Sequence, residues 1–392
     1  MSYTVLARRY RSQSFDAVVG QEAIARTLQS AIETNRVAHA YLFVGTRGVG
    51  KTTMARVFAK ALNGGSPEVD QAIMSGQDTD VIEIDAASNA GVDQARELIA
   101  NCIYRPLRGK YKIYIIDEVH MLSTHAFNAL LKTLEEPPEH VKFILCTTET
   151  QKVPATIQSR CQRFDFRNLS ASEIKTHLAN VLKGEKYQAD DDALHAVARL
   201  AAGSMRDALS LLDRLIAAVP EGPGGRITYR LIEQLLGLPQ RELLADLIAA
   251  VSSADAARAL TITDDLLSRG ISPSQLIESL VSRFRDLMIL CACGPKTPLV
   301  ELDDEARELA VRQAQSFDAP GLLHMIALCE SVASRLRNTA TPRALLDALI
   351  VRLAMAESFA DVSALLGAAP PASRAAIHSA PDTPRRAPAK KR

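Results

Sequence analysis

The sequence predicts an α/β domain built on a parallel sheet, followed by two helical regions. Over residues 1–168, short apolar runs of strand length alternate with helical stretches, which is the pattern of a parallel sheet covered by helices. Beyond residue 168 the chain has helical periodicity and almost no strand signal. Between an early apolar strand and the helix after it lies a glycine-rich segment with the spacing of a phosphate-binding loop, so the α/β part is expected to bind a nucleotide.

The glycine-rich segment follows an apolar strand over residues 41–44 and precedes a helix over 54–61. Its glycines permit backbone angles that turn several N–H groups inward, and the helix presents its positive end to an anion. Lys51 is expected to reach the β- and γ-phosphates of a nucleoside triphosphate, while the Thr52 hydroxyl holds Mg²⁺. The expected phosphate contacts are Gly45, Thr46, Gly48, Val49, Gly50, Lys51, Thr52 and Thr53.

Two adjacent acids follow a second apolar strand, expected over residues 111–116. An acid at the carboxyl end of a strand beside a phosphate loop orders Mg²⁺ and water, which is the role expected of Asp117. A second acid next to it, Glu118, can orient the attacking water. Either acid alone could be a solvated carboxylate at a strand end. Together with the phosphate loop, the pair predicts hydrolysis of the nucleotide and not only its binding.

Length and charge limit the possible classes of protein. The 392 residues are too many for one ordinary core, so about two to three domains are expected. Lys plus Arg total 46 against 45 Asp plus Glu, a formal net charge of +1, so any nucleic-acid contact must come from a local patch. No apolar run has the length of a membrane span and the start has no secretory pattern, so a cytoplasmic protein without membrane contact is expected.

Changes in composition divide the rest of the chain. A capping box at Ser170 opens the first helical region, which is expected over 169–222. The clearest linker in the chain is the segment 220–225, Pro-Glu-Gly-Pro-Gly-Gly, and a second helical region is expected over 226–367. Residues 368–392 are rich in Ala, Pro and Arg and are expected to form a disordered basic tail.

Four segments together resemble the tau/gamma clamp-loader ATPase family of bacterial DNA polymerase III. They are residues 40–43 with the phosphate loop, Ile-Asp-Glu-Val-His-Met-Leu at 116–122, Phe-Asn-Ala-Leu-Leu-Lys-Thr-Leu-Glu-Glu-Pro-Pro at 127–138, and Ser-Arg-Cys at 159–161. The resemblance is strong over residues 1–240. The later part resembles the family only in being a collar-like helical region. The resemblance implies an AAA+ domain, an all-helical lid over the first helical region, and a collar-like oligomerisation domain over the second.

The resemblance also implies an activity and partners. It implies an ATPase that is part of the DNA polymerase III holoenzyme, a nucleotidyltransferase complex. Its ring-like pentamer would contain further copies of this chain with the delta and delta-prime subunits. ATP binding would let the ring open a sliding clamp (beta) and grip primer–template DNA, and DNA-triggered hydrolysis would release the closed clamp on DNA.

The resemblance assigns roles to residues outside the two motifs. Thr148 would be the polar sensor-1 residue, with the adjacent Thr147 left open as the alternative. Arg206 would reach the γ-phosphate from the lid as the sensor-2 residue. Arg160 would be an arginine finger on the ATP of the neighbouring subunit, the plain alternative being a surface salt bridge. The residues that would enclose the adenine are Tyr10, Val18 and Val19.

Two features depart from the pattern of the family. Its members usually carry a four-cysteine zinc module after the phosphate-loop helix, but the polar segment 63–80 has no cysteine and is expected to be a connection, so no zinc is expected. Among the 6 cysteines only Cys291 and Cys293 lie close together, and such a pair alone is a poor metal site. The family also tends to place a basic residue after Ser88, where this chain has Asn-Ala-Gly; Arg96 remains a weak candidate for a contact with a DNA phosphate.

Two other interpretations share part of these motifs. One is another AAA+ motor, such as a branch-migration helicase or a helicase loader, which would not be expected to have the run at 127–138 or the Ser-Arg-Cys element. The other is a non-hydrolysing structural subunit of a clamp loader, which would not need an intact phosphate loop. The sequence favours the clamp-loader ATPase over both.

Overall fold

The computed structural model of the chain describes residues 4–88, 91–219, 225–300, 302, 304–336 and 339–355. The chain divides into two compact units, one of residues 1–240 with 297–309, and one of residues 241–296 with 310–392. The predicted basic tail over 368–392 lies outside the described residues.

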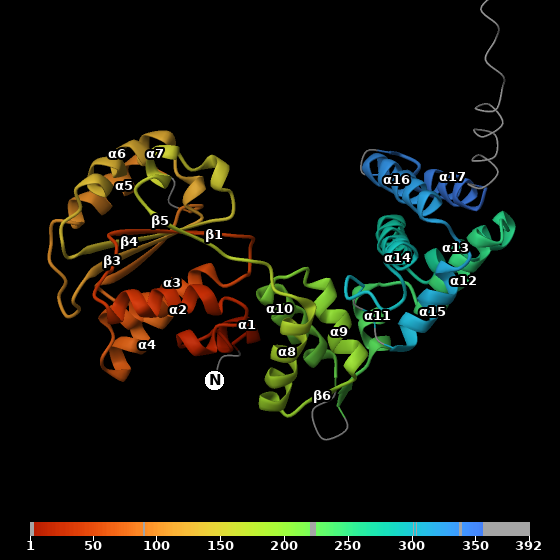
Figure 1. The fold of residues 1–392 in the computed structure, drawn as a ribbon, viewed down its shortest axis with the longest axis horizontal. Helices are drawn as coiled ribbons and strands as arrows, with labels where there is room; N and C mark the ends of the chain where they lie inside the picture. The colour runs from red at the N-terminus through yellow and green to blue at the C-terminus, as the bar shows by residue number, and fades with distance from the viewer. Residues whose placement is uncertain are drawn as a thin grey trace, which may run out of the picture. The chain divides into compact units, whose positions relative to one another are not determined.

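The first unit contains a five-stranded sheet in which every pairing is parallel (Figure 1). The order of its strands is β2-β3-β4-β1-β5, so β1, the strand before the phosphate loop, lies inside the sheet between β4 and β5. The parallel α/β fold predicted from the alternation of apolar runs and helices is confirmed. The strands are β1 (Ala40–Val44), β2 (Val81–Asp85), β3 (Lys112–Asp117), β4 (Val141–Thr147) and β5 (Gln162–Asp165).

Alternate residues of the strands belong to two separate cores. Tyr41 and Phe43 of β1 pack on one face of the sheet, and Ala40 and Leu42 pack on the other, as the two-residue period of a strand requires. All four side chains are fully buried. The first face is covered by α2 (Glu22–Glu33), α3 (Lys51–Asn63) and α4 (Pro67–Ser75), and the second by α5 (Val92–Asn101), α6 (Thr124–Glu135) and α7 (Ala155–Gln158), as Figure 1 shows.

The helix α4 corrects one expectation. The polar segment 63–80 was expected to be a connection, but nine of its residues form this helix. Its ends carry the usual signals: the Ser66 hydroxyl accepts the N–H of Val69, Pro67 occupies the first turn, and Gly76 ends the helix in the left-handed conformation. The helix was not predicted because the segment is polar and only Ile73 and Met74 of the helix are buried.

The lid is the name used below for the helices that follow the sheet in the same unit. The predicted capping box is confirmed: the Ser170 hydroxyl accepts the N–H of Glu173, and the Glu173 carboxylate accepts the N–H of Ser170. The lid has one apolar core of its own, and Ile232 of its last helix is fully buried in that core. Its helices are α8 (Ala171–Glu185), α9 (Asp191–Leu200), α10 (Met205–Ala218) and α11 (Tyr229–Leu236), and the two short strands β6 (Gln188–Ala189) and β7 (Arg226–Ile227) pair in parallel.

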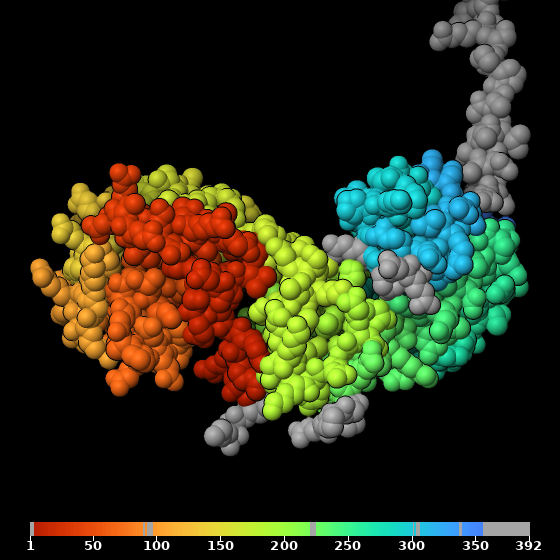
Figure 2. Space-filling view, turned by 60° about the horizontal axis from the view of Figure 1, so that its bottom comes forward, coloured from red at the N-terminus to blue at the C-terminus, as the bar shows by residue number. Residues whose placement is uncertain are grey.

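The N-terminal arm, residues 4–19, begins on the lid. Leu6, in the short helix α1 (Leu6–Arg9), is buried in the lid core. The Tyr10 hydroxyl donates to the Glu185 carboxylate at 2.5 Å. Figure 2 shows this red arm beside the yellow-green lid. The arm is therefore anchored on the lid by an apolar side chain and a hydrogen bond.

In the described part of the second unit, all regular secondary structure is helical. Helix α14 packs along α16, and α17 packs against α13 and α16 (Figure 1). Phe284 of α14 is buried and meets the Phe317 ring edge-on. None of the described helices of the chain is both long and apolar enough to cross a membrane. The helices are α12 (Arg241–Ser252), α13 (Ala256–Ser268), α14 (Pro273–Cys293), α16 (Ala319–Leu336) and α17 (Pro342–Ala354). Helix α15 (Asp304–Ala314) spans the boundary, with its residues up to 309 assigned to the first unit.

A buried carboxylate holds the loop between α5 and β3. Asp80 is 2% exposed, and its two oxygens accept the backbone N–H groups of Leu107, Arg108 and Gly109 at 2.7, 2.7 and 2.9 Å. Burial by itself would raise the pKa of Asp80, but these three donors and the Lys112 charge lower it overall, because they favour the charged form.

Asp80→Asn should therefore destabilise the protein by about 1–3 kcal/mol at pH 7, since an amide cannot accept all three N–H groups with equal strength. A carboxyl group whose folded-state pKa is lowered contributes stability above its unfolded pKa and loses that contribution as the pH falls through the folded value. The difference in free energy of unfolding between the two proteins should thus be complete at pH 7 and shrink below about pH 4. Urea titrations across this range measure it, and a constant difference would contradict the assignment.

Candidate active site

Three neighbouring strands end at the candidate site. Strands β3, β4 and β1 are adjacent and parallel, so their carboxyl ends meet at one edge of the sheet. Asp117 ends β3, Thr147 ends β4, and Gly45 follows β1. The Gly45 N–H donates to the Thr147 carbonyl at 3.2 Å, which continues the pairing of β1 with β4 into the phosphate loop.

A cavity at this edge brings most of the predicted residues together. Gly45, Thr46, Thr148 and Arg160 are not among the described residues that line it. The carbonyl of Gly45 and that of Thr46 nevertheless contact Lys51, which does line it. The predicted residues that line the cavity are Tyr10, Val18, Val19, Gly48, Val49, Gly50, Lys51, Thr52, Thr53, Asp117, Glu118 and Arg206.

Two glycines of the loop are required for different reasons. Gly48 has φ +79°, and a Cβ at this position would lie 2.0 Å from the Ser204 hydroxyl oxygen of the lid. Gly50, at the start of α3, has φ +102° with open space around its missing Cβ, so its requirement is conformational. The Arg206 N–H also donates to the Gly48 carbonyl at 3.4 Å. The start of α10 in the lid thus contacts the phosphate loop directly, close to the first residue of α3.

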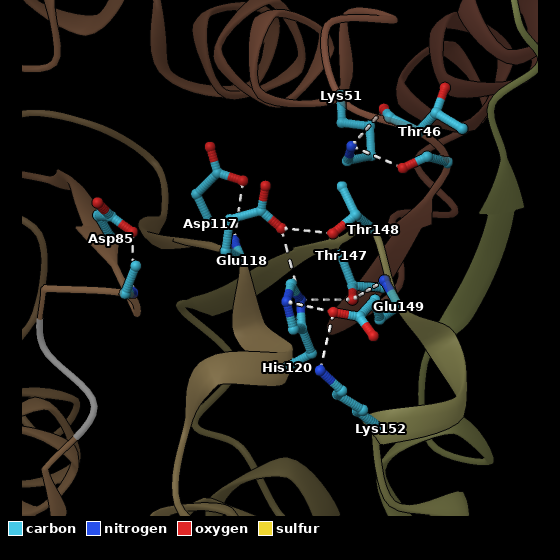
Figure 3. A network of polar contacts seen from close by, with 12 residues as sticks. Thr46, Lys51, Asp85, Asp117, Glu118, His120, Thr147, Thr148, Glu149 and Lys152 are labelled. Carbon is cyan, nitrogen blue, oxygen red and sulfur yellow. Dashed lines mark hydrogen bonds and ion pairs between the residues drawn. The ribbon is translucent and has the colours of Figure 1, made fainter. Parts of the chain in front are cut away.

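Lys51 is a buried cation held by the loop itself. Its Nζ donates to the Gly45 and Thr46 carbonyls, both at 2.8 Å, and the residue is 6% exposed (Figure 3). Burial lowers the pKa of Lys51, and the nearby charges of Glu118 and Asp117 oppose that shift. Two neutral carbonyls therefore satisfy the ammonium group, which leaves both acids free for other partners.

Asp117 and Thr52 form an all-oxygen pair beside the loop. The Thr52 hydroxyl donates to Asp117 Oδ2 at 2.6 Å, and the Glu118 N–H donates to Asp117 Oδ1 at 2.9 Å. Burial raises the pKa of Asp117, although these two donors partly offset it. No group of three or more His, Cys, Asp and Glu side chains in the described residues could hold a metal. Mg²⁺ commonly binds through one or two carboxylates plus substrate phosphates, so this donor pair fits it.

Glu118 has an unusual backbone, and one threonine faces it. Its φ of +47° and ψ of +45° are left-handed, which costs a non-glycine residue about 1–3 kcal/mol. The Thr148 hydroxyl donates to Glu118 Oε2 at 3.1 Å. The Thr147 hydroxyl instead lies 3.2 Å from Nδ1 of His120 and accepts the Glu149 N–H (Figure 3). Of the two threonines left open by the sequence, Thr148 is therefore the one that contacts the acid.

Arg160 lies apart from this cavity. Its guanidinium forms a salt bridge with Glu135 at 2.5 Å and donates to the Thr156 carbonyl at 2.6 Å. Its side chain is 32% exposed. The surface salt bridge considered as the plain alternative is thus present, although exposed pairs of this kind contribute only about 0–1 kcal/mol. The weak DNA candidate, Arg96, belongs to α5, but its side chain lies outside the described residues.

Some residues at the site were not predicted from the sequence. The arm supplies Arg11, which lines the cavity with one guanidinium nitrogen that has no hydrogen-bond partner among the described residues. Burial lowers the pKa of Arg11, and the charge of Arg56 adds to that shift. The lid supplies His177, Met205 and Leu209. No local signal marks these residues, because their place depends on how the arm and the lid pack.

Three family models match successive parts of the chain. The model described as "DNA polymerase III, delta subunit" matches residues 20–170. The one described as "DNA polymerase III clamp loader subunit, ATPase lid domain" matches residues 173–220. The one described as "DNA polymerase III subunits gamma and tau domain III" matches residues 227–367.

Curated relatives agree with these matches. DNA polymerase III subunit gamma of Buchnera aphidicola subsp. Schizaphis graminum is 43% identical over 251 residues, which cover 62% of this chain and 68% of that protein. The chain belongs to the gamma/tau family of DNA polymerase III clamp-loader subunits. The family resemblance and the AAA+ fold predicted from the sequence are thereby confirmed.

Other gamma/tau family members are longer than this chain. DNA polymerase III subunit tau of Bacillus subtilis (strain 168) is 40% identical over 365 residues, 90% of this chain and 63% of that protein. Subunit tau of Escherichia coli (strain K12) is 43% identical over 323 residues, 79% of this chain and 49% of that protein. The chain therefore spans about half to two thirds of the length of these two relatives.

Proposed function

We propose that this chain is the ATPase motor of a clamp loader, which uses ATP to open a sliding clamp and place it on primed DNA in the bacterial cytoplasm. The observation that carries the proposal is the meeting of Lys51, Thr52, Asp117 and Glu118 at one edge of the sheet, with Arg206 of the lid above the loop. Nucleotidyl transfer is assigned to other subunits of the holoenzyme, since none of these residues has a role in it.

Binding of the nucleotide follows from the loop. The N–H groups of residues 48–52 and the start of α3 receive the phosphates. Lys51 exchanges its two carbonyl partners for the β- and γ-phosphates, and these charge-assisted bonds are stronger than those it leaves. Thr52 and Asp117 would hold Mg²⁺, which when bound neutralises phosphate charge. Arg206 reaches the γ-phosphate from the lid, and Tyr10, Val18 and Val19 line the adenine side.

Hydrolysis requires a base for the attacking water. Glu118 is placed to accept its proton, and the hydroxyl of Thr148 at 3.1 Å orients that carboxylate. The backbone of Glu118 is left-handed, and strain of this kind gathers at functional sites. Asp117 lies directly before it, so one strand end supplies both acids.

The site is completed by a neighbouring subunit in this proposal. Arg160 is outside its own cavity and partly exposed, as a residue acting across an interface would be. There it stabilises charge that develops on the transferred phosphoryl group. The proposed ring contains further copies of this chain with delta and delta-prime subunits.

A surface loop suits the sliding clamp as a partner. Ile103, Tyr104 and Leu107 are 76%, 65% and 80% exposed, although apolar side chains of this size are usually buried. Asp80 fixes the backbone of Leu107, so the loop presents these side chains in a defined arrangement. We assign this loop, residues 103–107, to contact with the clamp.

The first prediction here concerns the two key charged residues. Lys51→Ala should weaken binding of MgATP by about 10- to 100-fold, because the cation facing the phosphates is lost. Glu118→Gln should bind MgATP normally and hydrolyse it about 10²- to 10⁴-fold more slowly, because an amide does not accept the proton from water. Calorimetry and single-turnover hydrolysis measure the two effects. Lys60→Ala, on the same helix, is the control and should match the wild type; equal behaviour of all three variants would refute the site.

The second prediction separates the two roles of Arg160. Both Arg160→Ala and Glu135→Ala break the same salt bridge. If Arg160 acts on the ATP of a neighbouring subunit, only its own removal should lower DNA-stimulated hydrolysis by the assembled ring, by about 10³-fold or more. Affinity of the isolated subunit for ATP should stay within twofold in both. Equal loss of activity in the two variants would show that the salt bridge, and not a finger, is what matters.

The third prediction tests the loop 103–107. Leu107→Ser should weaken binding of the sliding clamp to the ATP-bound loader by about 10-fold or more, because one buried leucine contributes about 1.5–3 kcal/mol to an interface. ATP affinity should not change. The control is Leu200→Ser, another exposed leucine, 42% exposed in the lid. Clamp binding by surface plasmon resonance decides the matter, and undiminished binding of Leu107→Ser would remove the loop from the interface.

A further inference from the structure

One buried histidine behind the proposed catalytic acid has no role in the function proposed above. His120 is in the short 3₁₀ helix η2 (Val119–Met121), and its side chain is 6% exposed. Its Nδ1 lies 3.4 Å from Glu118 Oε2 and 3.2 Å from the Thr147 hydroxyl, while its Nε2 lies 3.4 Å from Glu149 Oε1. Figure 3 shows the imidazole between the two carboxylates. His120 is not among the described residues that line the proposed nucleotide cavity.

The far carboxylate belongs to the segment that carries Arg160. Glu149 precedes the 3₁₀ helix η3 (Thr150–Lys152), and the Lys152 ammonium donates to the same Glu149 oxygen at 2.9 Å. The Gln158 side chain of α7 then donates to the Thr150 carbonyl at 3.1 Å and to the Val153 carbonyl at 2.8 Å. Residues 149–158 are thus tied together by polar contacts, and Arg160 follows directly, with its N–H on the Ile157 carbonyl.

The near carboxylate has little freedom to move alone. Glu118 Oε2 is shared by the Thr148 hydroxyl and His120, and the left-handed backbone at Glu118 leads straight into η2. A turn of the carboxylate toward a water molecule therefore lengthens its contact with His120. An imidazole has its two nitrogens on opposite sides of a rigid ring, so displacement on one side is passed to the other.

We propose that His120 is a positioning residue that couples the orientation of Glu118 to the position of the segment 149–160. The nucleotide bound to this chain thereby changes the position of Arg160, the residue proposed to act on the ATP of the neighbouring subunit. This inference rests on the proposed ATPase function. It adds a series of contacts, through Glu118, His120 and Glu149, by which nucleotide binding in one subunit affects the ATP site of the neighbouring subunit.

If His120 has only a structural role, a different experimental result is expected. A buried imidazole that only satisfies two carboxylates would, when removed, lower stability and leave ligand responses unchanged. A coupling residue, when removed, should abolish the response of the segment 149–160 to nucleotide while nucleotide still binds. His120→Phe keeps an aromatic side chain and removes both nitrogens. Glu149→Ala breaks the same series of contacts at a more exposed position, where its side chain is 37% exposed, so folding is not at risk.

The experiment is hydrogen–deuterium exchange on the full chain, with and without MgATPγS at saturation. In the wild type, the analogue should slow exchange in the phosphate-loop peptide 45–53 and change exchange in the peptide 153–161 by threefold or more. In His120→Phe and in Glu149→Ala, the change at 45–53 should remain, and the change at 153–161 should fall below 1.5-fold. The matched controls are His125→Phe and Glu139→Ala, both exposed residues, which should respond as the wild type does.

The outcomes separate the two levels of the argument. An absent response at 45–53 in the wild type would overturn the proposed function and this inference with it. A response at 45–53 without one at 153–161 in the wild type would overturn the coupling alone. A wild-type response at 153–161 in both His120→Phe and Glu149→Ala would do the same. If His120→Phe does not fold, Glu149→Ala decides by itself.

Discussion

The parallel pairing of β3, β4 and β1 is the constraint on which the rest of the structure depends. It places Val44 opposite Thr147 and Ile116 opposite Leu145, so the three strands end within a residue of one another. A slip of one residue would exchange the two faces of a strand and turn Asp117 away from the loop. Because both faces of the sheet are covered by helices, such a slip would also move each side chain of the strand into the other, differently packed core. The same burial that stabilises the sheet therefore fixes the geometry of the site.

Two charged groups at this edge, Lys51 and Asp117, are each satisfied by a local partner. Lys51 donates to two carbonyls and Asp117 accepts from Thr52, so neither depends on an ion pair between them. A buried charge without a partner would be costly, and burial accordingly shifts the pKa of Lys51 down and that of Asp117 up. These partners are weaker than phosphate and Mg²⁺ would be. The site is thus stable as it stands and can exchange its hydrogen bonds for stronger ones.

Local patterns made the fold class and the two motifs predictable, because strand, loop and helix follow one another within a few residues. The features that depend on tertiary packing were not predictable. Helix α4 was missed since few of its side chains are buried. The choice between Thr147 and Thr148 needs the direction of each hydroxyl at the end of β4. The contact of His120 with Glu149 joins the segments that follow β3 and β4, which no spacing in the sequence reveals.

The cavity lined by Lys51 lies where the chain crosses between two cores at two places. Val18 packs in the sheet core while Leu6 packs in the lid core, so the arm crosses between them beside Tyr10. The second crossing runs from Phe166, in the sheet core, to Leu169, in the lid core. Motion of the lid over the sheet must be absorbed at these two short crossings, since both cores are close-packed. The arm supplies the proposed adenine contacts and the lid supplies Arg206, so the proposed function links base binding to the position of the lid. The two crossings, and not either core, are therefore where the relative position of the lid and the sheet can change.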